Sequence, residues 1–496
     1  MNNRKNHPAL IPLTTFSALV FCGFARCEPA ADSAMRAAQG KVPDLPERPN
    51  ILLVVVDDLN DEVGFLDDPH AMTPNMDRLA SQSAVFVNAH VQAPICGPSR
   101  NSFLTGKYPH NTGLYGLDPL FRDVPELSTL TSLPQHFREH GYRSVGVGKI
   151  YHTKRDELSF DNPNPGWFGA FGPFPDKEIN LDPDLPFSKY YDWGPFLEET
   201  ETADYKVAQY ACRQIEEFAT SKTPWFLSVG FFRPHCPYFA PQKWFDLHPV
   251  ADIPPAVDES DDLKDIPSYG LKLVGYNAQQ KFDQWLNKTD KTASFQQAYR
   301  ACVSFADHCM GMVLDALKAS GLENNTIVVL LGDQGLQNGA KNLWYKRTLW
   351  EKTTRVPLVI KVPGQPARRI TAPAGLIDIY PTLCELAGLP VPDGLDGLSL
   401  TGLIEGRPGA EQRPPALTSH GPGNFSLRDE RWRYTRYADG SEELYDHTND
   451  PEERRNLATN AEYKDAIARL KPFVPEESKP FAPGSKGMGS PQFPGK

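Results

Sequence analysis

The sequence predicts an α/β protein with a large, mostly parallel sheet sandwiched by helices and a smaller C-terminal α+β subdomain that carries an antiparallel sheet. Three observations predict this class. Short β-branched runs alternate with helical patterns, the runs are apolar throughout, as in strands buried on both faces, and the pattern changes near residue 406. A chain of 496 residues with 40% hydrophobic content can bury one large core and a smaller companion.

Six apolar runs are predicted as strands of the large sheet, because each is short, rich in β-branched residues and bounded by polar segments. They are residues 51–56, 84–91, 143–148, 225–232, 326–331 and 357–362. Helices are predicted between them. Thr73 and Pro74 fit the N-cap and first position of one helix, and Gly141 ends another that starts near Thr131.

The C-terminal part has a different pattern. Residues 426–447 alternate polar and aromatic side chains around an Ala-Asp-Gly turn at 438–440, which predicts an antiparallel hairpin, and residues 461–473 follow as a helix. The predicted organisation is a signal peptide at 1–27, a linker at 28–48, the main domain at 49–405, the C-terminal subdomain at 406–481 and a flexible tail at 482–496.

The first 27 residues have the form of an export signal, with basic residues before an apolar stretch at 9–25 and small residues after it. The alternative is an uncleaved membrane anchor, but the apolar stretch is shorter than the ~20 residues that a span requires. We therefore expect a periplasmic or secreted protein with no membrane attachment once the signal is removed. The formal net charge of -11 argues against a nucleic-acid partner.

Removal of the signal leaves six cysteines in an oxidising compartment. Six thiols in a chain of this length do not form a disulfide scaffold, and no pair has the spacing of a zinc site. They are Cys96, Cys212, Cys236, Cys302, Cys309 and Cys384.

Acidic side chains follow two of the predicted strands. Asp57 and Asp58 come directly after residues 51–56, and Asp333 and Gln334 come shortly after residues 326–331. Ligands of open α/β sheets gather beyond the carboxyl ends of the strands, so these four side chains are expected to meet. Their oxygen atoms form the ligand set that Ca²⁺ or Mg²⁺ prefers. Asp57 and Asp58 taken alone have a simpler interpretation, in which one carboxylate caps a loop and the other lies in water.

Basic side chains and histidines follow other strands. Lys149 and His152 come after residues 143–148, and His235 follows residues 225–232 within an Arg-Pro-His segment. Lys341 and Lys346 come after the second acidic pair. Taken alone, each of these residues is more typical of an ordinary surface position than of a catalyst. Several cations and two histidines at strand ends are what an ester of an oxyanion needs around it.

Cys96 lies in the stretch PICGPSRNSFLTGK, just ahead of a predicted helix. Pro98 fits the first helical position, so the thiol is expected at or just before the helix N-terminus. Backbone N–H groups and the helix dipole favour an anion there, which would activate a thiol, but a cysteine hydrolase also needs a paired histidine. On the residues alone, a reactive and a merely buried cysteine both remain open.

These segments match a known family. Residues 96–100, Cys-Gly-Pro-Ser-Arg, followed by Leu-Thr-Gly-Lys at 104–107, resemble the C-x-P-S-R…L-T-G-[KR] signature of type I sulfatases, within the alkaline phosphatase superfamily. The resemblance extends across nearly the whole mature chain, and the segments GKIYH and RPHCP resemble those of iduronate-2-sulfatase-like bacterial sulfatases. It implies an alkaline phosphatase-like fold and a sulfuric ester hydrolase.

The resemblance also implies a mechanism. A separate maturation enzyme would convert Cys96 to Cα-formylglycine, whose hydrated aldehyde is the nucleophile, and Arg100 would stabilise that hydrate. One Ca²⁺ would be held by Asp57, Asp58, Asp333 and Gln334. The sulfate pocket would be lined by Lys149, His152, His235 and Lys346, with His235 or Lys346 protonating the departing alcohol and His152 removing a proton from the sulfated intermediate.

The expected function is therefore an exported sulfatase that acts on a sulfated saccharide, with a uronate 2-O-sulfate as the first candidate. The alternatives are a phosphodiesterase or phosphonate monoester hydrolase of the same superfamily, and a non-catalytic glycan-binding homologue. Gln334 departs from the family, which usually has Asn or His there, so its longer side chain must find room beside the metal. Three tryptophans in the cleft-forming loops could stack on sugars or simply pack, and these are Trp167, Trp193 and Trp285.

Overall fold

The structure is a computed structural model that describes residues 47–182, 189–254, 261–274 and 277–487. All of these residues belong to one compact unit, which spans 44–496. The predicted signal peptide and all but the last two residues of the predicted linker lie outside the described residues, as does the tail from residue 488. None of the described helices is long and apolar enough to cross a membrane.

The centre of the fold is a seven-stranded sheet in the order β10-β2-β9-β8-β1-β6-β4. Five of the six predicted runs form strands of this sheet near their expected bounds. β9 runs antiparallel to both of its neighbours, β8 and β2, while the other adjacent pairs are parallel, so the mostly parallel sheet is confirmed. The strands are β1 (Asn50–Val56), β2 (Ala84–Phe86), β4 (Arg143–Gly148), β6 (Trp225–Phe231), β8 (Thr326–Gly332), β9 (Leu358–Lys361) and β10 (Arg368–Ile370).

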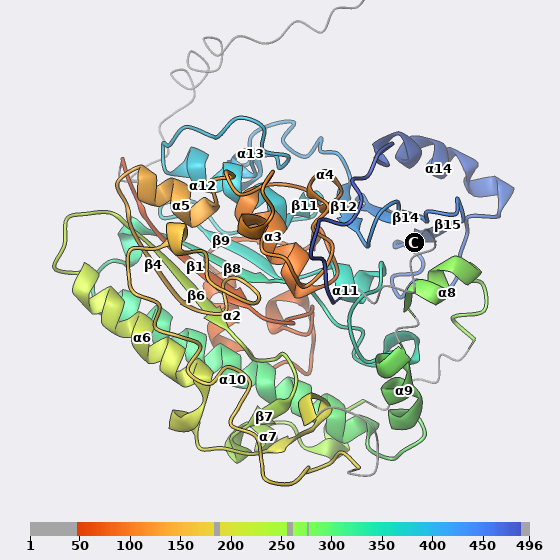
Figure 1. The fold of residues 1–496 in the computed structure, drawn as a ribbon, viewed down its shortest axis with the longest axis horizontal. Coiled ribbons are helices and arrows are strands. Elements are labelled where there is room, and N and C mark those ends of the chain that lie inside the picture. Colours follow the sequence, from red (N-terminus) through yellow and green to blue (C-terminus); the bar gives the residue numbers. More distant parts are fainter. Residues whose placement is uncertain (1–46, 183–188, 255–260, 275–276, 488–496) are drawn as a thin grey trace, which may run out of the picture. The chain divides into compact units, whose positions relative to one another are not determined.

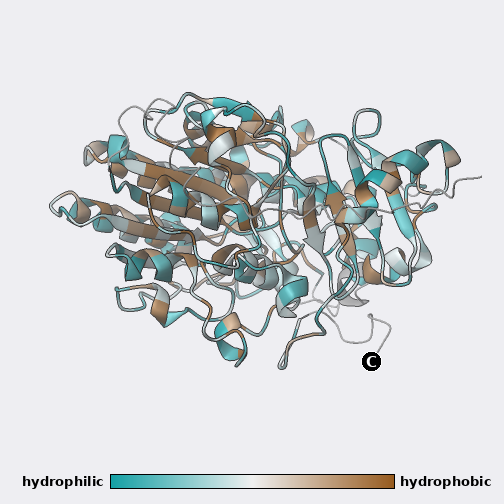
Figure 2. Cartoon of the chain, turned by 90° about the horizontal axis from the view of Figure 1, so that it is seen from above, coloured by the Kyte–Doolittle hydropathy of each residue, from teal (hydrophilic) through white to brown (hydrophobic). Residues whose placement is uncertain are grey.

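Helices cover both faces of this sheet (Figure 1). Alternate residues of β1 enter two different cores, because successive side chains of a strand point to opposite faces. Leu52, Val54 and Val56 pack beneath the long helices α6 and α10, whereas Ile51 and Leu53 pack on the side of α5 and α12. Figure 2 shows the hydrophobic residues concentrated along these strands. The apolar runs are therefore continuous because both faces of the sheet are buried.

The helices are short apart from α6 and α10. Ser132 caps α5 by accepting a hydrogen bond from the Gln135 amide at 3.4 Å, and Thr73 and Pro74 occupy the predicted N-cap and first position of α2. The helices are α2 (Pro74–Ala80), α3 (Cys96–Thr105), α4 (Pro109–Thr112), α5 (Leu133–Glu139), α6 (Ala203–Phe218), α7 (Gln242–Asp246), α8 (Ser268–Val274), α9 (Asn277–Leu286), α10 (Thr292–Ala319), α11 (Glu351–Thr354), α12 (Ile379–Leu386), α13 (Thr401–Glu405) and α14 (Lys464–Leu470).

The run at 84–91 is not one strand, as the sequence predicts, but two. β2 ends at Phe86, and β3 (Ala89–His90) pairs instead with β11 (Ala374–Gly375) in a separate small sheet. The break falls at Asn88, whose side-chain amide donates hydrogen bonds to the carbonyls of Thr371 and Asp429 at 3.1 and 3.2 Å. These bonds hold the chain between the large sheet and the C-terminal part.

A four-stranded antiparallel sheet forms the C-terminal part, in the order β12-β13-β14-β15, as predicted. The predicted hairpin is β14 and β15, and α14 packs its apolar side on the sheet. A second small sheet pairs β5 (Trp193–Pro195) with β7 (Tyr238–Ala240). The four C-terminal strands are β12 (Ala416–Ser419), β13 (Phe425–Arg428), β14 (Trp432–Arg436) and β15 (Glu442–Asp446).

The segment at 479–486 lies against residues 110–118, so the beginning of the predicted flexible tail is packed. The amide of Leu117 donates a hydrogen bond to the carbonyl of Lys486 at 2.8 Å, and the amide of Ala482 donates to that of Gly113 at 2.9 Å. This strap holds the chain that follows α3.

Candidate active site

Four adjacent strands, β8, β1, β6 and β4, run parallel and end at the same edge of the sheet. The segments that follow them therefore meet, as the strand-end argument predicts. Cys96 reaches the same place from the start of α3, and its Sγ atom lies 3.9 Å from Asp58 Oδ1. The side chains brought together are Asp57 and Asp58 after β1, Asp333 and Gln334 after β8, His235 after β6, and Lys149 and His152 after β4.

Arg100 ties two of the carboxylates together. Its Nη2 atom donates to Asp57 Oδ1 at 3.1 Å, and its Nε atom donates to Asp333 Oδ2 at 2.7 Å. Its Nη1 atom donates to the carbonyls of Lys149 and Ile150, and the side chain is 1% exposed. The hydrogen bonds of this guanidinium thus go to acidic side chains and backbone rather than to Cys96.

The pKa values of the three buried carboxylates are shifted in different directions. Burial raises the pKa of Asp57, but Lys149, His235 and Arg100 outweigh it and hold that pKa well below its usual range. Burial, together with the Asp57 and Asp333 carboxylates, raises the pKa of Asp58 to about 7, even though Lys346 opposes the shift. Burial also raises the pKa of Asp333. Crowded acids of this kind favour a proton or a cation between them.

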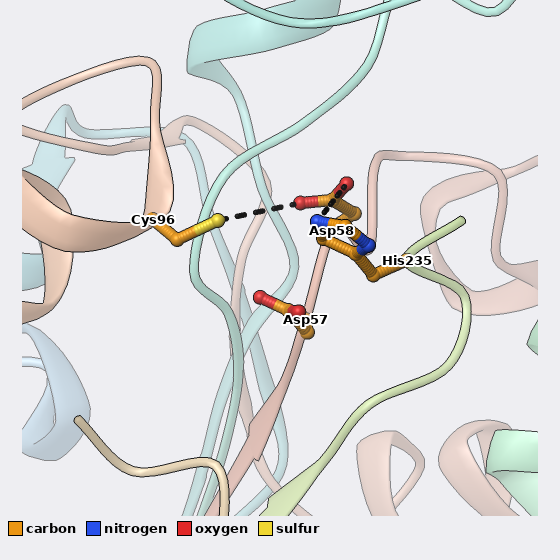
Figure 3. A group of neighbouring side chains, drawn as sticks. All are labelled: Asp57, Asp58, Cys96 and His235. Carbon is orange, nitrogen blue, oxygen red and sulfur yellow. Dashed lines mark hydrogen bonds and ion pairs between the residues drawn. The ribbon is translucent and has the colours of Figure 1, made fainter. Parts of the chain in front are cut away.

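Asp58 is the centre of the group, and Figure 3 shows it between Cys96 and His235. Its carboxylate accepts from Lys346 Nζ at 2.6 and 2.9 Å and from the Gln334 amide, and it lies 3.7 Å from His235 Nε2. Its backbone adopts a left-handed conformation with φ 61°. This conformation is uncommon for residues other than Gly, although Asp and Asn adopt it more readily than most, and it is often found at functional sites.

The donor set fits a hard divalent cation. Four residues place ligand atoms within 4.8 Å of one another, and two of them, Asp57 and Asp58, supply carboxylates beside the Cys96 thiol and the His235 ring. The Asp333 carboxylate lies next to Asp58, since its Oδ1 atom accepts from the Asp58 amide at 3.0 Å. Gln334 Oε1 is buried and has no hydrogen-bond partner among the described residues, so a neutral oxygen donor is available beside the carboxylates. Oxygen ligands of this type suit Ca²⁺.

Cys96 is the first residue of α3. Pro98 is therefore the third helical residue, whereas the sequence predicts it as the first. Burial raises the pKa of the Cys96 thiol to about 12, with Lys149 and Lys346 opposing the shift. Lys346 Nζ lies 3.2 Å from Cys96 Sγ. The thiol is therefore protonated at neutral pH and is a poor nucleophile in this form.

The two histidines are both held neutral. Burial lowers the pKa of His152 to about 3, and the charge of Lys149 contributes to the shift. The Nδ1 atom of His152 is buried and has no hydrogen-bond partner among the described residues. Burial and Lys346 hold the pKa of His235 well below its usual value, and its Nδ1 atom lies 2.5 Å from the carbonyl oxygen of Cys236. Both rings keep a nitrogen that can accept a proton.

Three residues considered from the sequence lie elsewhere. Lys341 is buried against the C-terminal sheet, where it donates to Asp262 at 2.8 Å and to the carbonyl of Glu453 at 2.6 Å. Trp193 is a core residue, and Trp285 packs beside it with ring centroids 6.3 Å apart. Packing is therefore the role of these two tryptophans. Trp167 is half-buried in a loop near β4 and β6.

Other contributors were not predicted from the sequence. Tyr299, from α10, donates to the carbonyl of Asp58 at 2.9 Å and holds the strained position. Ser99 donates to the carbonyl of Asp333 at 2.5 Å, and its place in the Cys-x-Pro-Ser-Arg stretch is the signal that could have found it. Phe171 packs on His235 with ring centroids 4.6 Å apart, and no sequence signal marks it.

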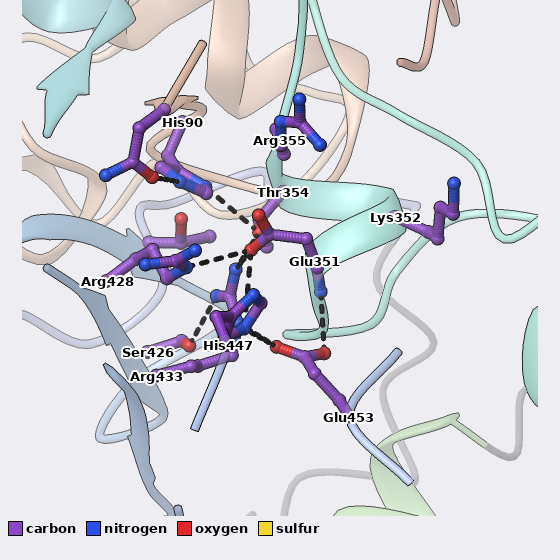
Figure 4. A network of polar contacts seen from close by, with 12 residues as sticks. His90, Glu351, Lys352, Thr354, Arg355, Ser426, Arg428, Arg433, His447 and Glu453 are labelled. Carbon is purple, nitrogen blue, oxygen red and sulfur yellow. Dashed lines mark hydrogen bonds and ion pairs between the residues drawn. The ribbon is translucent and has the colours of Figure 1, made fainter. Parts of the chain in front are cut away.

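A second polar cluster lies behind the site, around Glu351 at the start of α11 (Figure 4). Arg433 donates from Nη2 to Glu351 and from Nε to Glu453 at 2.5 Å, and His447 Nε2 lies 2.9 Å from Glu453. Burial raises the pKa of Glu351, but Arg428 and the other nearby cations hold it well below its usual range. The cluster joins α11 to the C-terminal sheet. Because the amide of Gly335 donates to the carbonyl of Thr353 at 2.9 Å, α11 also supports the segment that carries Gln334.

Comparison with known families gives two matches. The family described as Sulfatase matches residues 49–389, which is more than half of the chain. The family described as N-sulphoglucosamine sulphohydrolase, C-terminal, matches residues 339–479, the region of the small antiparallel sheet.

Proteins that are similar to this chain are also named as sulfatases. The chain is 37% identical over 463 residues to a sulfatase from Formosa agariphila, an alignment that covers 90% of each chain. It is 30% identical over 397 residues to the iduronate 2-sulfatase of Homo sapiens, covering 69% of this chain and 70% of the relative. Among solved structures, a 2-O GAG sulfatase superposes with a TM-score of 0.69 at 22% identity, covering 86% of this chain and 91% of that one, which shows a shared fold.

Proposed function

Because this chain belongs to the sulfatase family and is a sulfuric ester hydrolase, we propose that it removes sulfate from a saccharide with a formylglycine nucleophile made from Cys96. The observation that carries this proposal is the position of Cys96 at the start of α3, 3.2 Å from Lys346 Nζ and 3.9 Å from Asp58 Oδ1. A thiol at this point is buried and protonated, so it needs chemical conversion before it can attack sulfur. Once converted, residue 96 would supply the attacking hydroxyl as the hydrate of its aldehyde.

The proposed cofactor is one Ca²⁺ held by Asp57, Asp58, Asp333 and Gln334. Three carboxylates and one uncommitted amide oxygen at a single strand edge support this assignment. When bound, the cation would supply positive charge against a sulfate oxygen. Arg100 would be a positioning residue, because it bridges Asp57 and Asp333 and so fixes the spacing of two proposed metal ligands.

The remaining side chains have separate proposed roles. Lys149 and Lys346 would hold sulfate oxygens, because their ammonium groups already lie among the carboxylates at the base of the site. Lys346 or His235 would give a proton to the departing alcohol, and Lys346 is favoured, because its ammonium carries the proton while burial and Lys346 hold the His235 ring neutral. His152 would take the proton from the sulfated intermediate, since burial keeps its ring neutral and its Nδ1 atom has no partner among the described residues.

The saccharide substrate is supported by the names of the relatives. The relative from Homo sapiens is an iduronate 2-sulfatase, so a uronate 2-O-sulfate is the first compound to test. The basic start and apolar stretch of residues 1–27 support export to the periplasm or the medium, where polysaccharides are met. A net charge of -11 favours one sulfate held in a local basic pocket over bulk attraction to a polyanion.

The test is a substrate comparison with protein co-expressed with a formylglycine-generating enzyme. The kcat/KM for a 2-O-sulfated uronate disaccharide is compared with those for an aryl sulfate, choline sulfate and an aryl phosphodiester under one set of conditions. The proposal expects the sulfated disaccharide to have the highest kcat/KM. A wide preference for choline sulfate or the aryl sulfate would contradict the saccharide assignment, and a preference for the phosphodiester would contradict the proposed reaction.

A further inference from the structure

An open groove of about 650 Å³ begins beside the candidate base His152. Its inner end is formed by Thr153, the next residue in the chain, and by Leu120. The same two residues also line a small cavity together with His152, Gly97 and Arg100, so the groove lies next to residues of the candidate active site. Its outer part is lined by Lys154, Arg155, Leu158, Asn164 and Trp167.

The lining of the groove is amphipathic. Trp167, Leu120 and Leu158 supply apolar surface, and the Leu158 residue is 48% exposed. Lys154 lies at the rim, where its ammonium pairs with Asp123 at 2.5 Å and remains largely exposed. A pyranose ring has the same combination of apolar faces and hydroxyl edges, and pockets of about 300–1,000 Å³ are typical of small-ligand sites.

Arg155 lines the groove with a side chain that is almost wholly buried. Its side chain is 7% exposed, its Nη2 atom donates to the Asn162 carbonyl at 2.7 Å, and the Glu157 carboxylate lies 3.7 Å from Nε. The Nε atom is buried and has no hydrogen-bond partner among the described residues. Because the protein encloses this atom, Arg155 shapes the wall of the groove and offers no Nε donor at its surface.

The turn that presents Trp167 is strained. Phe168 and Ala170 adopt left-handed backbone conformations with φ 48° and 50°, although both carry a Cβ atom. Such conformations are unfavourable for residues other than Gly, Asn and Asp, and they persist where surrounding contacts impose them.

Those contacts join the turn to the candidate active site. Trp167 packs on Phe232, with ring centroids 5.7 Å apart. Phe171, at the end of the turn, packs on His235, and its carbonyl accepts from Arg233 Nη2 at 3.2 Å. The segment that carries His235 therefore sets the position of Trp167.

We infer that this groove is the subsite for the sugar ring next to the sulfated one, with Trp167 as its stacking platform. This inference rests on the proposed saccharide substrate. Stacking on the Trp167 ring would hold the neighbouring ring while the ester lies at Cys96. It predicts that longer saccharides are better substrates than a single sulfated residue, because each filled subsite adds binding energy.

The experiment compares chain lengths. The kcat/KM is measured for a 2-O-sulfated uronate monosaccharide and for the tetrasaccharide that ends in the same residue, in wild type, Trp167→Ala and Trp167→Phe. The tetrasaccharide is expected to exceed the monosaccharide by about tenfold in wild type, and Trp167→Ala is expected to remove most of that gain, with Trp167→Phe between them. Trp244→Ala is the matched control, because Trp244 is also half-buried but packs on Phe305 and lines none of the groove.

A binding measurement separates recognition from turnover. Calorimetric titration of the desulfated tetrasaccharide into Cys96→Ala protein is expected to give a Kd that the added Trp167→Ala change weakens by about tenfold. A gain with chain length that survives Trp167→Ala, or is lost equally in Trp244→Ala, would overturn the subsite. Equal turnover of the two lengths by wild type would overturn the subsite and leave the saccharide assignment standing. Turnover of aryl sulfate with no turnover of either saccharide would overturn both.

Discussion

Lys346 donates a hydrogen bond to the Sγ atom of Cys96 across 3.2 Å, which joins two residues 250 positions apart in the sequence. The same ammonium bonds both oxygens of the Asp58 carboxylate, at 2.6 and 2.9 Å. It thus lies between the residue that is proposed to become the nucleophile and a carboxylate of the proposed metal site. Its removal should affect turnover more than folding, since its side chain is partly accessible from the site.

Replacing Lys346 by Ala is expected to lower kcat by about 10²–10³-fold, because a preorganised cation is lost where charge develops on the sulfate and the departing alcohol. Lys346→Arg should recover only part of this loss. The measurement is steady-state kinetics on an aryl sulfate. Lys243→Ala, which removes an exposed cation paired with Glu199, is the control and should keep wild-type kcat. Wild-type kcat in Lys346→Ala would remove this residue from the mechanism.

Asp333 tests the metal assignment. Asp333→Asn is expected to weaken Ca²⁺ binding by at least about tenfold, because one of three carboxylates is neutralised in a site that selects cations by ligand charge. Calorimetric titration of chelator-treated protein with Ca²⁺ measures the effect, and elemental analysis of untreated protein should find one Ca²⁺ per chain. Asp315→Asn, at an exposed salt bridge with Arg78, is the control. Stoichiometric zinc, or an unchanged Ca²⁺ affinity in Asp333→Asn, would contradict the assignment.

The unconverted thiol should be inert. Burial raises the pKa of Cys96 to about 12, so its reactive thiolate is scarce below that pH and grows only as the pH rises toward it. In metal-free protein made without the maturation enzyme, iodoacetamide at pH 8 is expected to leave Cys96 unmodified, as read by peptide mass spectrometry. The same peptide should be alkylated after denaturation. Labelling of folded protein as fast as that of a free thiol would show that the site is open and the thiol acidic.

Arg433 on β14 and Arg431, just before that strand, should differ in their effect on stability. Arg433 is 1% exposed and pairs with both Glu351 and Glu453, whereas Arg431 is exposed and pairs with Asp446 at 2.6 Å. Removing one partner of a buried charge cluster costs about 3–5 kcal/mol, so Arg433→Ala is expected to lower the thermal midpoint by many degrees. Arg431→Ala should leave the midpoint almost unchanged, since exposed pairs contribute little. Equal midpoints would show that the cluster is not needed for folding.

Much of the site could be predicted from the sequence because strand ends are recognisable. Asp57 and Asp333 follow apolar runs that form parallel neighbours in the sheet, and parallel strands present their carboxyl ends at one edge. The position of Cys96 at a helix start was predicted from Pro98 to within two residues. The direction of β9 was not predictable, since an isolated apolar run carries no sign of which way it pairs.

Other features depend on contacts between distant segments. Tyr299 lies on α10, and nothing in its sequence surroundings shows that it bonds the carbonyl of Asp58. The position of Phe171 depends on a strained turn, and the break at Asn88 depends on carbonyls of Thr371 and Asp429. The segment from 482 to 487 has the composition of a disordered tail. Backbone hydrogen bonds to residues 113–118 nevertheless hold it in place, and such bonds cannot be predicted from composition.

Peptide mass spectrometry of Cys96 in active protein tests the central claim most directly. Protein co-expressed with a maturation enzyme should show the peptide that contains residue 96 with the mass loss that accompanies exchange of a thiol for an aldehyde. Activity should rise in proportion to the converted fraction, and Cys96→Ala should abolish it. Full sulfatase activity in protein whose Cys96 is entirely an unmodified thiol, or undiminished activity in Cys96→Ala, would contradict the account.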